Sequence, residues 1–547
     1  MPGVPTSKGC EACRRRKKGC DLVQPTCGRC TKLGLKCINN GTGRLKFVDE
    51  SKTWAHRKSS SGSNTTGRSS KASTPSPEST TTVTTNSSSR ESSLDLQVAQ
   101  LCRSALLSQA VGAFWEAYTP RASGLPTFSS RGIQSSKWLQ AALREAHSDP
   151  GLNDAVMALA MSRASRISGN KDARKDALMF YGSCVRNVRR AIVAGDRLYD
   201  DHLLATVMLL ATFEVHEGTA QRDKAWGAHI NGASRLINAR GAWSFQTEFG
   251  RILYLGHLRD ELIYGIGTRG KSRHGVDQTS YKPTPEDMTD LDVQLVSILS
   301  SMPSIMESAD HIRTIDDVAQ VREATLDLRT RCHEIMDVLE KFDETLQWSQ
   351  ADLLYWEEPS QLALSLAPDS DERVFTTFIT FCDFPIACLQ FTTWTSLLLM
   401  HSTLWLTYQW LRCYRPEAMI DQAIPMMVPP DKLDLCNDLA INIVKSMEYF
   451  VQPEMGLVGA QQIAYPMSIV MGYLTYWNRQ ERMWFPVIFR RLKELNIGIE
   501  GFLVDTFKGN ELRMIRPLAE KEPRFVDQKQ SGNVFAQVLA ENPTPET

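Results

Sequence analysis

Apolar residues recur at steps of three and four along most of the chain beyond residue 94. This spacing is typical of helices that bury one face. Between residues 203 and 215 the sequence is apolar almost all round, which predicts a fully buried helix. Alternating patterns that would indicate strands are scarce. The pattern therefore predicts an all-α body over residues 94–525 and a tail over 526–547. Its helices are expected to include residues 181–192, 203–215, 291–299, 318–346, 433–449 and 463–477.

The helix expected over residues 181–192 has a distinct apolar stripe. Arginines at positions 186, 189 and 190 fall outside this stripe. We expect the stripe to face the core. Its members are Tyr181, Cys184, Val185, Val188 and Ile192.

Residues 384–411 form a run of 28 residues without a charge. That length is sufficient to cross a bilayer. The run nevertheless contains Gln390, His401 and Gln409 together with several Thr and Ser residues, and polar groups inside a membrane are energetically expensive. We therefore expect a long core helix and no membrane-spanning segment.

A polar segment separates the body from the beginning of the chain. Between residues 59 and 93, 22 of 35 residues are Ser or Thr. Such a composition cannot bury enough apolar surface to offset the entropy of ordering it. We expect a disordered linker over residues 46–93, which joins an N-terminal domain over 5–45 to the helical body.

The formal net charge of zero hides a separation of charge. Residues 1–60 contain 14 Lys and Arg against 4 Asp and Glu, whereas the remaining residues contain 48 against 58. A basic head on an acidic body indicates a head that binds a polyanion.

The basic head also holds a regular array of cysteines. Two CxxC pairs are each followed, after six residues, by a single cysteine, and such pairs are typical ligands of one metal ion. A redox CxxC and a purely structural zinc knot are the alternatives; a redox site would need a βαβ context, which is missing here. The six cysteines are Cys10, Cys13, Cys20, Cys27, Cys30 and Cys37.

Coordination arithmetic indicates two ions that share ligands. Tetrahedral Zn²⁺ takes four ligands, so two ions need eight positions, yet there are six cysteines and no His between residues 10 and 37. Two thiolates must then bridge both ions. The repeat favours Cys10 and Cys27 for that role. Because the segment has few apolar residues, its folding should depend on metal binding.

The cysteine spacing, the basic run after Cys13, Asp21 and Pro25 resemble the fungal Zn2Cys6 binuclear-cluster transcription factors. The resemblance implies a nuclear protein that binds double-stranded DNA and two Zn²⁺ ions. One ion would be held by Cys10, Cys13, Cys20 and Cys27, and the other by Cys27, Cys30, Cys37 and Cys10. The expected fold is a small metal-folded Zn2Cys6 cluster domain plus a large all-α domain joined by a disordered linker.

The family resemblance also implies which cations contact DNA. In this family the residue four positions after the second cysteine reads a CGG-like triplet in the major groove; here that residue is Lys17, with Lys18 as a helper. Phosphate contacts position such a module, whereas groove contacts select the sequence. The alternative is that the basic run serves only as a nuclear-import signal. The predicted DNA contacts are Arg14, Arg15, Arg16, Lys17, Lys18, Lys32 and Lys36.

Dimerisation is left open by the sequence. Many members of this family pair through a coiled coil soon after the cluster, which fixes the spacing of their half-sites. Residues 38–58 lack two clean heptads. A homodimer would therefore form without an evident coiled coil.

The body contains a second, looser resemblance. Trp226, His229 and Gly232 follow one another at intervals of three and resemble the helical regulatory domain of fungal zinc-cluster factors, where a coactivator or a small-molecule effector could bind. We expect His229 to be a hydrogen-bonded core residue, and Gly232 with Ala233 to permit close helix packing.

The remaining motifs are weak. Residues 352–372 mix acids with aromatics and are expected to form a loop between helices, with a coactivator-binding segment as the alternative. Gly265–Gly270 matches the GxGxxG dinucleotide pattern, but a helical stretch precedes it, so we expect a loop that binds no nucleotide. The seven cysteines beyond residue 100 lack ligand spacing and should be core thiols.

These observations predict a zinc-dependent, sequence-specific DNA-binding transcription regulator of RNA polymerase II genes, and not an enzyme. The alternative is a ligand-sensing or protein-interaction helical protein whose basic zinc head binds nucleic acid nonspecifically.

Overall fold

The computed structural model describes two compact units, Met1–Asn86 and Ser87–Thr547. Within them the described residues are 13, 20–21, 27–33, 105, 108–121, 134–195, 197–217, 222–241, 244, 246–270, 284, 287–349, 353–419, 431–499 and 502–503. The linker expected over residues 46–93 and the tail over 526–547 lie outside this set.

The described part of the first unit contains one short helix, α2 (Gly28–Lys32). It begins directly after Cys27, which caps it, and it ends at Leu33. Cys13, Cys27 and Cys30 are buried together, with Cys20 packed against them. Among the few residues of this unit that the structure describes, the buried core therefore consists of cysteines, as expected for a segment with few apolar residues.

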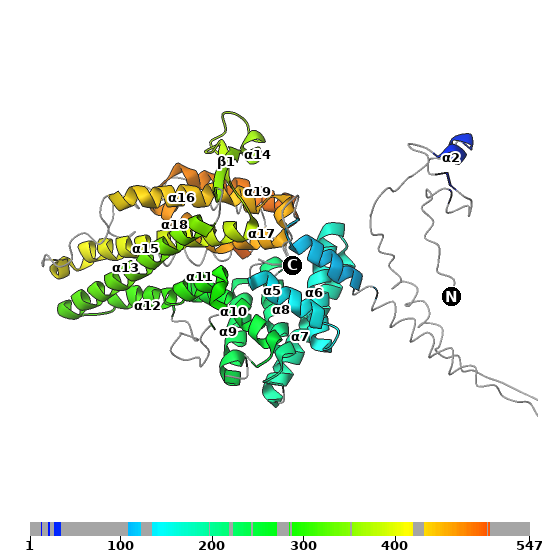
Figure 1. Ribbon diagram of the computed structural model, residues 1–547, viewed down its shortest axis with the longest axis horizontal. Helices are drawn as coiled ribbons and strands as arrows, with labels where there is room; N and C mark the ends of the chain where they lie inside the picture. Colours follow the sequence, from blue (N-terminus) through cyan, green and yellow to red (C-terminus); the bar gives the residue numbers. More distant parts are fainter. Residues whose placement is uncertain are drawn as a thin grey trace, which may run out of the picture. The chain divides into compact units, whose positions relative to one another are not determined.

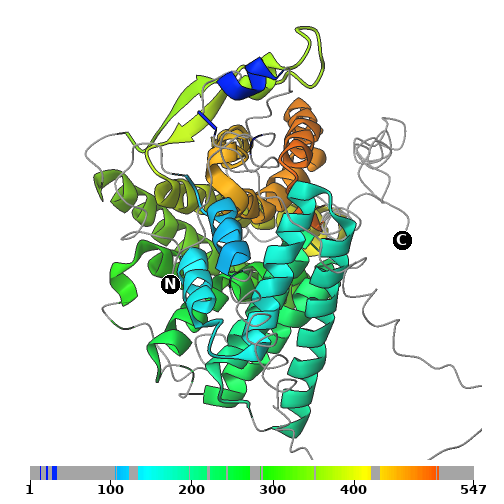
Figure 2. The same cartoon turned by 90° about the vertical axis from the view of Figure 1, so that its right-hand side faces the viewer.

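The second unit is a stack of helices around one continuous core. Its first part begins with a helix over residues 108–118. Figure 2 shows the teal helices α6 and α7 running side by side, and α8 packs against both of them. The helices of this part are α5 (Gln134–Glu145), α6 (Pro150–Ser168), α7 (Lys171–Ala194), α8 (Asp201–Glu217), α9 (Arg222–Arg240) and α10 (Glu248–Thr268).

The second part of the unit is built around α15 (Phe384–Tyr414), which packs against α13 and α16 (Figure 1). Its other helices are α11 (Leu291–Leu299), α12 (Met302–Ile312), α13 (Val318–Ser349), α14 (Gln361–Leu364), α16 (Asp431–Phe450), α17 (Gly456–Gln462), α18 (Ala464–Tyr476) and α19 (Trp484–Glu494), with 3-10 turns at Asp287–Thr289, Pro416–Met419, Pro453–Met455 and Gln480–Met483.

Local sequence signals explain where these helices begin. Asp149, Asn170, Thr247 and Asp383 cap α6, α7, α10 and α15 by accepting hydrogen bonds from backbone N–H groups of the first turn. Such caps satisfy donors that have no partner within the helix. The helices expected from periodicity are all present, with α11 matching its expected bounds.

The uncharged run over residues 384–411 forms α15, a buried core helix as expected. Its threonine hydroxyls donate to the carbonyl four residues earlier, for example Thr393 to Leu389 at 2.9 Å and Thr403 to Leu399 at 2.8 Å. These bonds satisfy hydroxyl groups that would otherwise be costly to bury. No helix in the described residues is long and apolar enough to cross a membrane.

The body is helical as predicted, but it also contains a hairpin that the sequence pattern does not reveal. Strand β1 (Tyr355–Pro359) pairs antiparallel with β2 (Thr377–Phe381). The loop expected over residues 352–372 is therefore wrong for much of its length. Beyond β1, Glu448 of α16 accepts hydrogen bonds from Ser360 Oγ at 2.5 Å and from Gln361 N at 2.8 Å, which fixes the start of α14 to the core.

Two further expectations are corrected. Residues 265–268 of the GxGxxG segment are not a loop but the last turn of α10, which ends at Arg269 in the left-handed conformation. In α7 the buried face consists of Ala173, Ala177, Cys184 and Ala191, whereas Val185 and Ile192 are exposed. The closely packed α6 meets α7 along small residues, so part of the larger apolar stripe remains outside the core.

Candidate metal centre

Three predicted ligands lie together in the first unit. The sulfur atoms of Cys13, Cys20 and Cys27 all lie within 4.8 Å of one another. The Sγ atoms of Cys13 and Cys27 are 3.8 Å apart, far longer than the disulfide bond length of about 2.0 Å. The chain thus brings three thiols from three separate positions of the motif to one point.

The geometry of this cluster fits zinc. With Zn–S bonds of about 2.3 Å, the sulfurs of a tetrahedral site lie about 3.8 Å apart, which is the separation of Cys13 and Cys27. Thiolates are also the usual ligands of structural zinc sites. Zinc bound here would supply the folding energy that so small a core lacks.

Cys27 connects the thiol cluster to α2. It is fully buried and stands at the N-cap of α2, where its sulfur accepts a hydrogen bond from Cys30 N at 3.4 Å. A backbone N–H directed at sulfur and the positive end of a helix both favour the thiolate form that binds metal. These contacts suit a residue that is predicted to bridge two ions.

A carboxylate joins the two halves of the cysteine repeat. Asp21 follows Cys20 in the first half, and both of its oxygens accept from the N–H of Gly28, at 2.9 Å and 3.2 Å. A Cβ on residue 28 would lie 2.7 Å from the Asp21 Oδ2 atom. Glycine at position 28 therefore allows Asp21 to approach the helix that carries Cys27 and Cys30.

The other predicted contacts are only partly described. Lys32 is exposed in the last turn of α2, and Arg29, which was not among the predicted DNA contacts, is exposed one turn earlier. Arg29 precedes Lys32 by three residues, and this helical spacing could have indicated Arg29 as a further DNA contact. The residues that lie outside the described set are Cys10, Arg14, Arg15, Arg16, Lys17, Lys18, Lys36 and Cys37.

The thiols of the second unit are in a different environment. Cys184, Cys332 and Cys436 are buried, and burial raises the pKa of each to about 12. Such thiols are poor metal ligands and nucleophiles. These three and Cys388 are core residues, as predicted, whereas Cys382 and Cys413 are only half-buried. Cys102 lies outside the described residues.

The motif around Trp226 is only partly as expected. His229 Nε2 and Tyr181 Oη are 3.0 Å apart, and burial lowers the pKa of His229 to about 4, so His229 is a hydrogen-bonded residue of the body. Gly232 is not required for close packing, because a Cβ there would meet only Val207 Cγ1 at 3.7 Å. The close approach occurs at Gly227 instead, where a Cβ would lie 2.6 Å from the ring of Tyr264.

Two regions of the chain match known families. Residues 8–44, which contain all six cysteines, match the fungal Zn(2)-Cys(6) binuclear cluster domain. Residues 117–251, which include α5 to α9, match the fungal specific transcription factor domain. The chain carries the two domains of a fungal Zn2Cys6 transcription factor. The head of this zinc-cluster chain accordingly holds two zinc ions, while the assignment of individual ligands stays a prediction.

Curated relatives of this zinc-cluster chain are similar over short segments. Transcription factor dibT of Pestalotiopsis microspora is 44% identical over 48 residues, which are 9% of this chain and 7% of the relative. A transcription factor of Aspergillus terreus is 59% identical over 29 residues, 5% of each chain. Oleate-activated transcription factor 1 of Saccharomyces cerevisiae is 59% identical over 29 residues, 5% of this chain and 3% of the relative.

The match therefore spans less than a tenth of the length of these relatives. No solved structure matches the chain.

Proposed function

We propose that the chain is a sequence-specific DNA-binding regulator of RNA polymerase II transcription that acts in the nucleus and reads CGG-like triplets in the major groove. The observation that supports this proposal is the thiol cluster of Cys13, Cys20 and Cys27 at the start of α2, within a segment that matches a binuclear zinc cluster domain.

The head has the charge that DNA binding needs. The run from Arg14 to Lys18 begins directly after the metal ligand Cys13, so zinc would hold its first residue in place. Lysine or arginine bound to the O6 and N7 atoms of guanine is the commonest base-specific contact. Arg29 and Lys32, exposed on α2, would then contact phosphates, which give affinity and register without sequence choice.

The proposal is tested with the zinc-loaded full chain on duplexes that contain a CGG triplet or a scrambled version of it. We expect tighter binding to the CGG duplex and a steep loss of affinity with salt. Lys17→Ala should cost about 1–3 kcal/mol on the CGG duplex and relax base choice. The control is Lys46→Ala, which removes a cation at the start of the expected linker, outside the cysteine motif. An unchanged base preference in Lys17→Ala would refute the role of Lys17.

The second candidate is a ligand-sensing or interaction protein with a nonspecific head. A large cavity in the second unit favours it, and an effector or coactivator could act there in either case. Equal binding to every duplex in the experiment above would support this candidate. A homodimer, if formed, would use surfaces other than a coiled coil directly after the cluster, and sedimentation of the DNA complex would detect it.

A further inference from the structure

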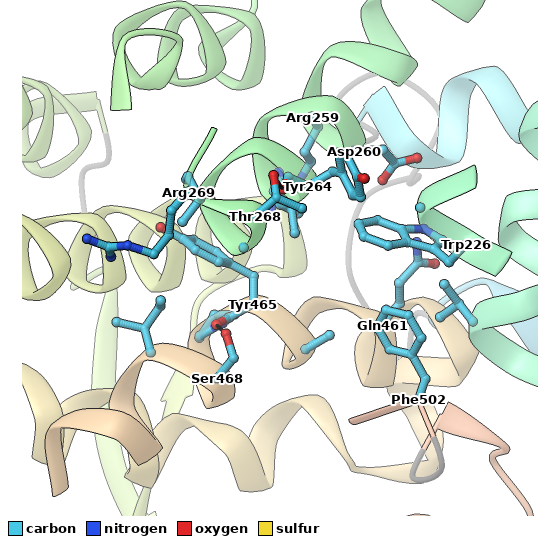
Figure 3. Close-up of a pocket in the computed structure, with 18 of the residues that line it drawn as sticks. Trp226, Arg259, Asp260, Tyr264, Thr268, Arg269, Gln461, Tyr465, Ser468 and Phe502 are labelled. Carbon is cyan, nitrogen blue, oxygen red and sulfur yellow. Dashed lines mark hydrogen bonds between the residues drawn. The ribbon is translucent and has the colours of Figure 1, made fainter. Parts of the chain in front are cut away.

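The second unit contains a cavity of about 500 Å³ between α9, α10 and the α17–α18 region. Cavities of about 300–1,000 Å³ are typical of sites for small organic molecules. Figure 3 shows Trp226 of α9 and Asp260 of α10 on one side, and Tyr465 and Ser468 of α18 on another. Most of the lining is apolar, with a few charged groups whose partners determine what the cavity can bind.

Two of these charged groups are arginines that are already neutralised. Arg259 donates to Asp292 at 2.8 Å and also to Thr392 and Gln462. Arg269 binds both oxygens of Asp310, at 2.7 Å and 2.9 Å. Both guanidinium groups are therefore committed to acidic partners on neighbouring helices. Neither offers an unneutralised positive charge to a ligand.

Asp260 is different. No donor among the described residues makes a hydrogen bond or an ion pair with its carboxyl group, although Asp260 lines the cavity. Burial raises the pKa of Asp260 to about 7, and the adjacent Arg259 offsets this only in part. Asp260 is half-buried, and a carboxylate partly withdrawn from water without a partner is costly. A ligand that brings a positive charge would remove that cost.

Aromatic side chains line the same cavity as this carboxyl group. The ring of Trp226 makes edge-to-face contacts with Tyr264, at 5.7 Å between centroids, and with Phe502, at 5.5 Å. Tyr264 lies one helical turn after Asp260 on α10, and Asn231 Nδ2 donates to its hydroxyl at 2.8 Å. Aromatic faces attract organic cations. Asp260 thus provides a negative charge and these rings provide an aromatic surface, a combination that suits an organic cation.

We propose that this cavity binds an organic cation, a protonated amine on an aromatic or alicyclic body, with the ammonium group at Asp260 and the body against Trp226, Tyr264 and Phe502. This site goes beyond the DNA-binding role of the head, and it does not depend on that role.

The exposed Lys224 distinguishes this proposal from an anion site. Lys224 also lines the cavity, two residues before Trp226 on α9. An anionic ligand would use its ammonium group and would avoid Asp260. For an amine ligand, Lys224 contributes only repulsion, so its removal should leave amine binding unchanged or strengthen it.

The test uses the zinc-loaded full chain and three probes with one indole body: tryptamine, which is cationic; N-acetyltryptamine, which is neutral; and indole-3-propionate, which is anionic. Binding is measured by calorimetry and by the thermal shift of the body. We expect tryptamine to bind about tenfold more tightly than either other probe, the effect of one charge-assisted contact.

Four variants locate the binding. Asp260→Asn keeps the shape of the side chain and should lose about tenfold in tryptamine affinity, while Lys224→Ala should not weaken it. Gly267 lines the cavity and a Cβ there meets nothing within 4 Å, so Gly267→Leu should narrow the cavity and weaken the binding of every probe. Asp176→Asn, on the exposed surface of α7, should behave as the unmodified chain. Circular dichroism shows that each variant is folded.

Three results would overturn the proposal. They are equal or tighter binding of the neutral or anionic probe, unchanged tryptamine affinity in folded Asp260→Asn, and no tryptamine binding at millimolar concentration.

Discussion

The carboxylate of Asp21 accepts hydrogen bonds from the backbone N–H of Gly28, at 2.9 Å from Oδ2 and 3.2 Å from Oδ1. This contact links the end of the first cysteine half-repeat to the start of α2, which Cys27 caps and which contains Cys30. A residue that is not itself a metal ligand therefore fixes the helix on which two of the predicted ligands stand.

The first prediction concerns this link. Asp21→Ala should lower zinc affinity about tenfold, since outer contacts that orient metal ligands typically carry effects of this size. Competition with a chelator measures the affinity. Lys32→Ala is the matched control in the same unit, because Lys32 is exposed. It should leave zinc affinity unchanged and weaken DNA binding, whereas equal zinc affinity in Asp21→Ala would contradict the role given to Asp21.

A second prediction follows from shared thiolates. Elemental analysis should find two zinc ions per chain, and chelation should abolish specific DNA binding because the head folds only with metal. Cys27→Ser should lose both ions, since Cys27 is predicted to bridge them. Cys30→Ser should retain one ion more readily than Cys27→Ser does, because Cys30 is predicted to bind only one of the two ions. Retention of one tightly bound ion in Cys27→Ser would exclude bridging by this residue.

The third prediction compares two glycines of α9. Gly232→Ala should stabilise the body by about 0.5–1 kcal/mol, because alanine is the better helix former and a Cβ there has room. Gly227→Ala should not give this gain, since its Cβ would lie 2.6 Å from the Tyr264 ring. Urea unfolding measures both variants. The explanation fails if Gly227→Ala proves as stable as Gly232→Ala.

The fourth prediction concerns pH. Because burial raises the pKa of Asp260 to about 7, the folded body holds this proton more tightly than the unfolded chain. The contribution of Asp260 to the stability of the body is therefore greatest when the carboxyl is protonated and falls as pH rises through the interval up to about 7. The groups that face Asp260 are Arg259, which opposes the shift, and Tyr118, whose own pKa is raised by burial and then by Asp260.

Asp260→Asn should abolish this loss. Its stability advantage over the unmodified chain should grow by about 1–3 kcal/mol between about pH 5 and about pH 8. Urea unfolding at the two pH values measures the difference, and Asp176→Asn should show no such growth. A constant difference across the range would show that Asp260 is not buried as a carboxylate.

The helices and the metal cluster were predictable because their signals are local. Three- and four-residue periodicity identifies a helix without knowledge of its neighbours, and the CxxC pairs bring their sulfurs together over short spans. Within the part of the chain that the structure describes, the all-α assignment missed the β1–β2 hairpin, which tertiary contacts stabilise. Strand β1 contains Glu357, Glu358 and Pro359, residues depleted in strands, and it is supported by β2 and by the Lys445–Glu357 ion pair at 2.7 Å.

Other features depend on which helix approaches which face. Val185 is exposed because α7 buries the face that carries its alanines instead, a choice that periodicity does not reveal. Helix α10 does not stop at the first glycine of its GxGxxG pattern. It continues to Thr268 and ends at Arg269, which adopts the left-handed conformation. The cavity residues Trp226, Asp260 and Phe502 come from distant parts of the sequence, so only the packed body brings them together.

The threonines of α15 have a consequence for biosynthesis. Thr392, Thr393, Thr395, Thr403 and Thr407 each donate to a carbonyl one turn earlier, which conceals their polarity once the helix is packed. During translation, before packing, the same hydroxyls lower the hydrophobicity that the membrane-insertion machinery recognises. Exchange of these threonines for valine would leave the shape of the core nearly unchanged while turning the emerging segment into a candidate for misdirection into the endoplasmic reticulum.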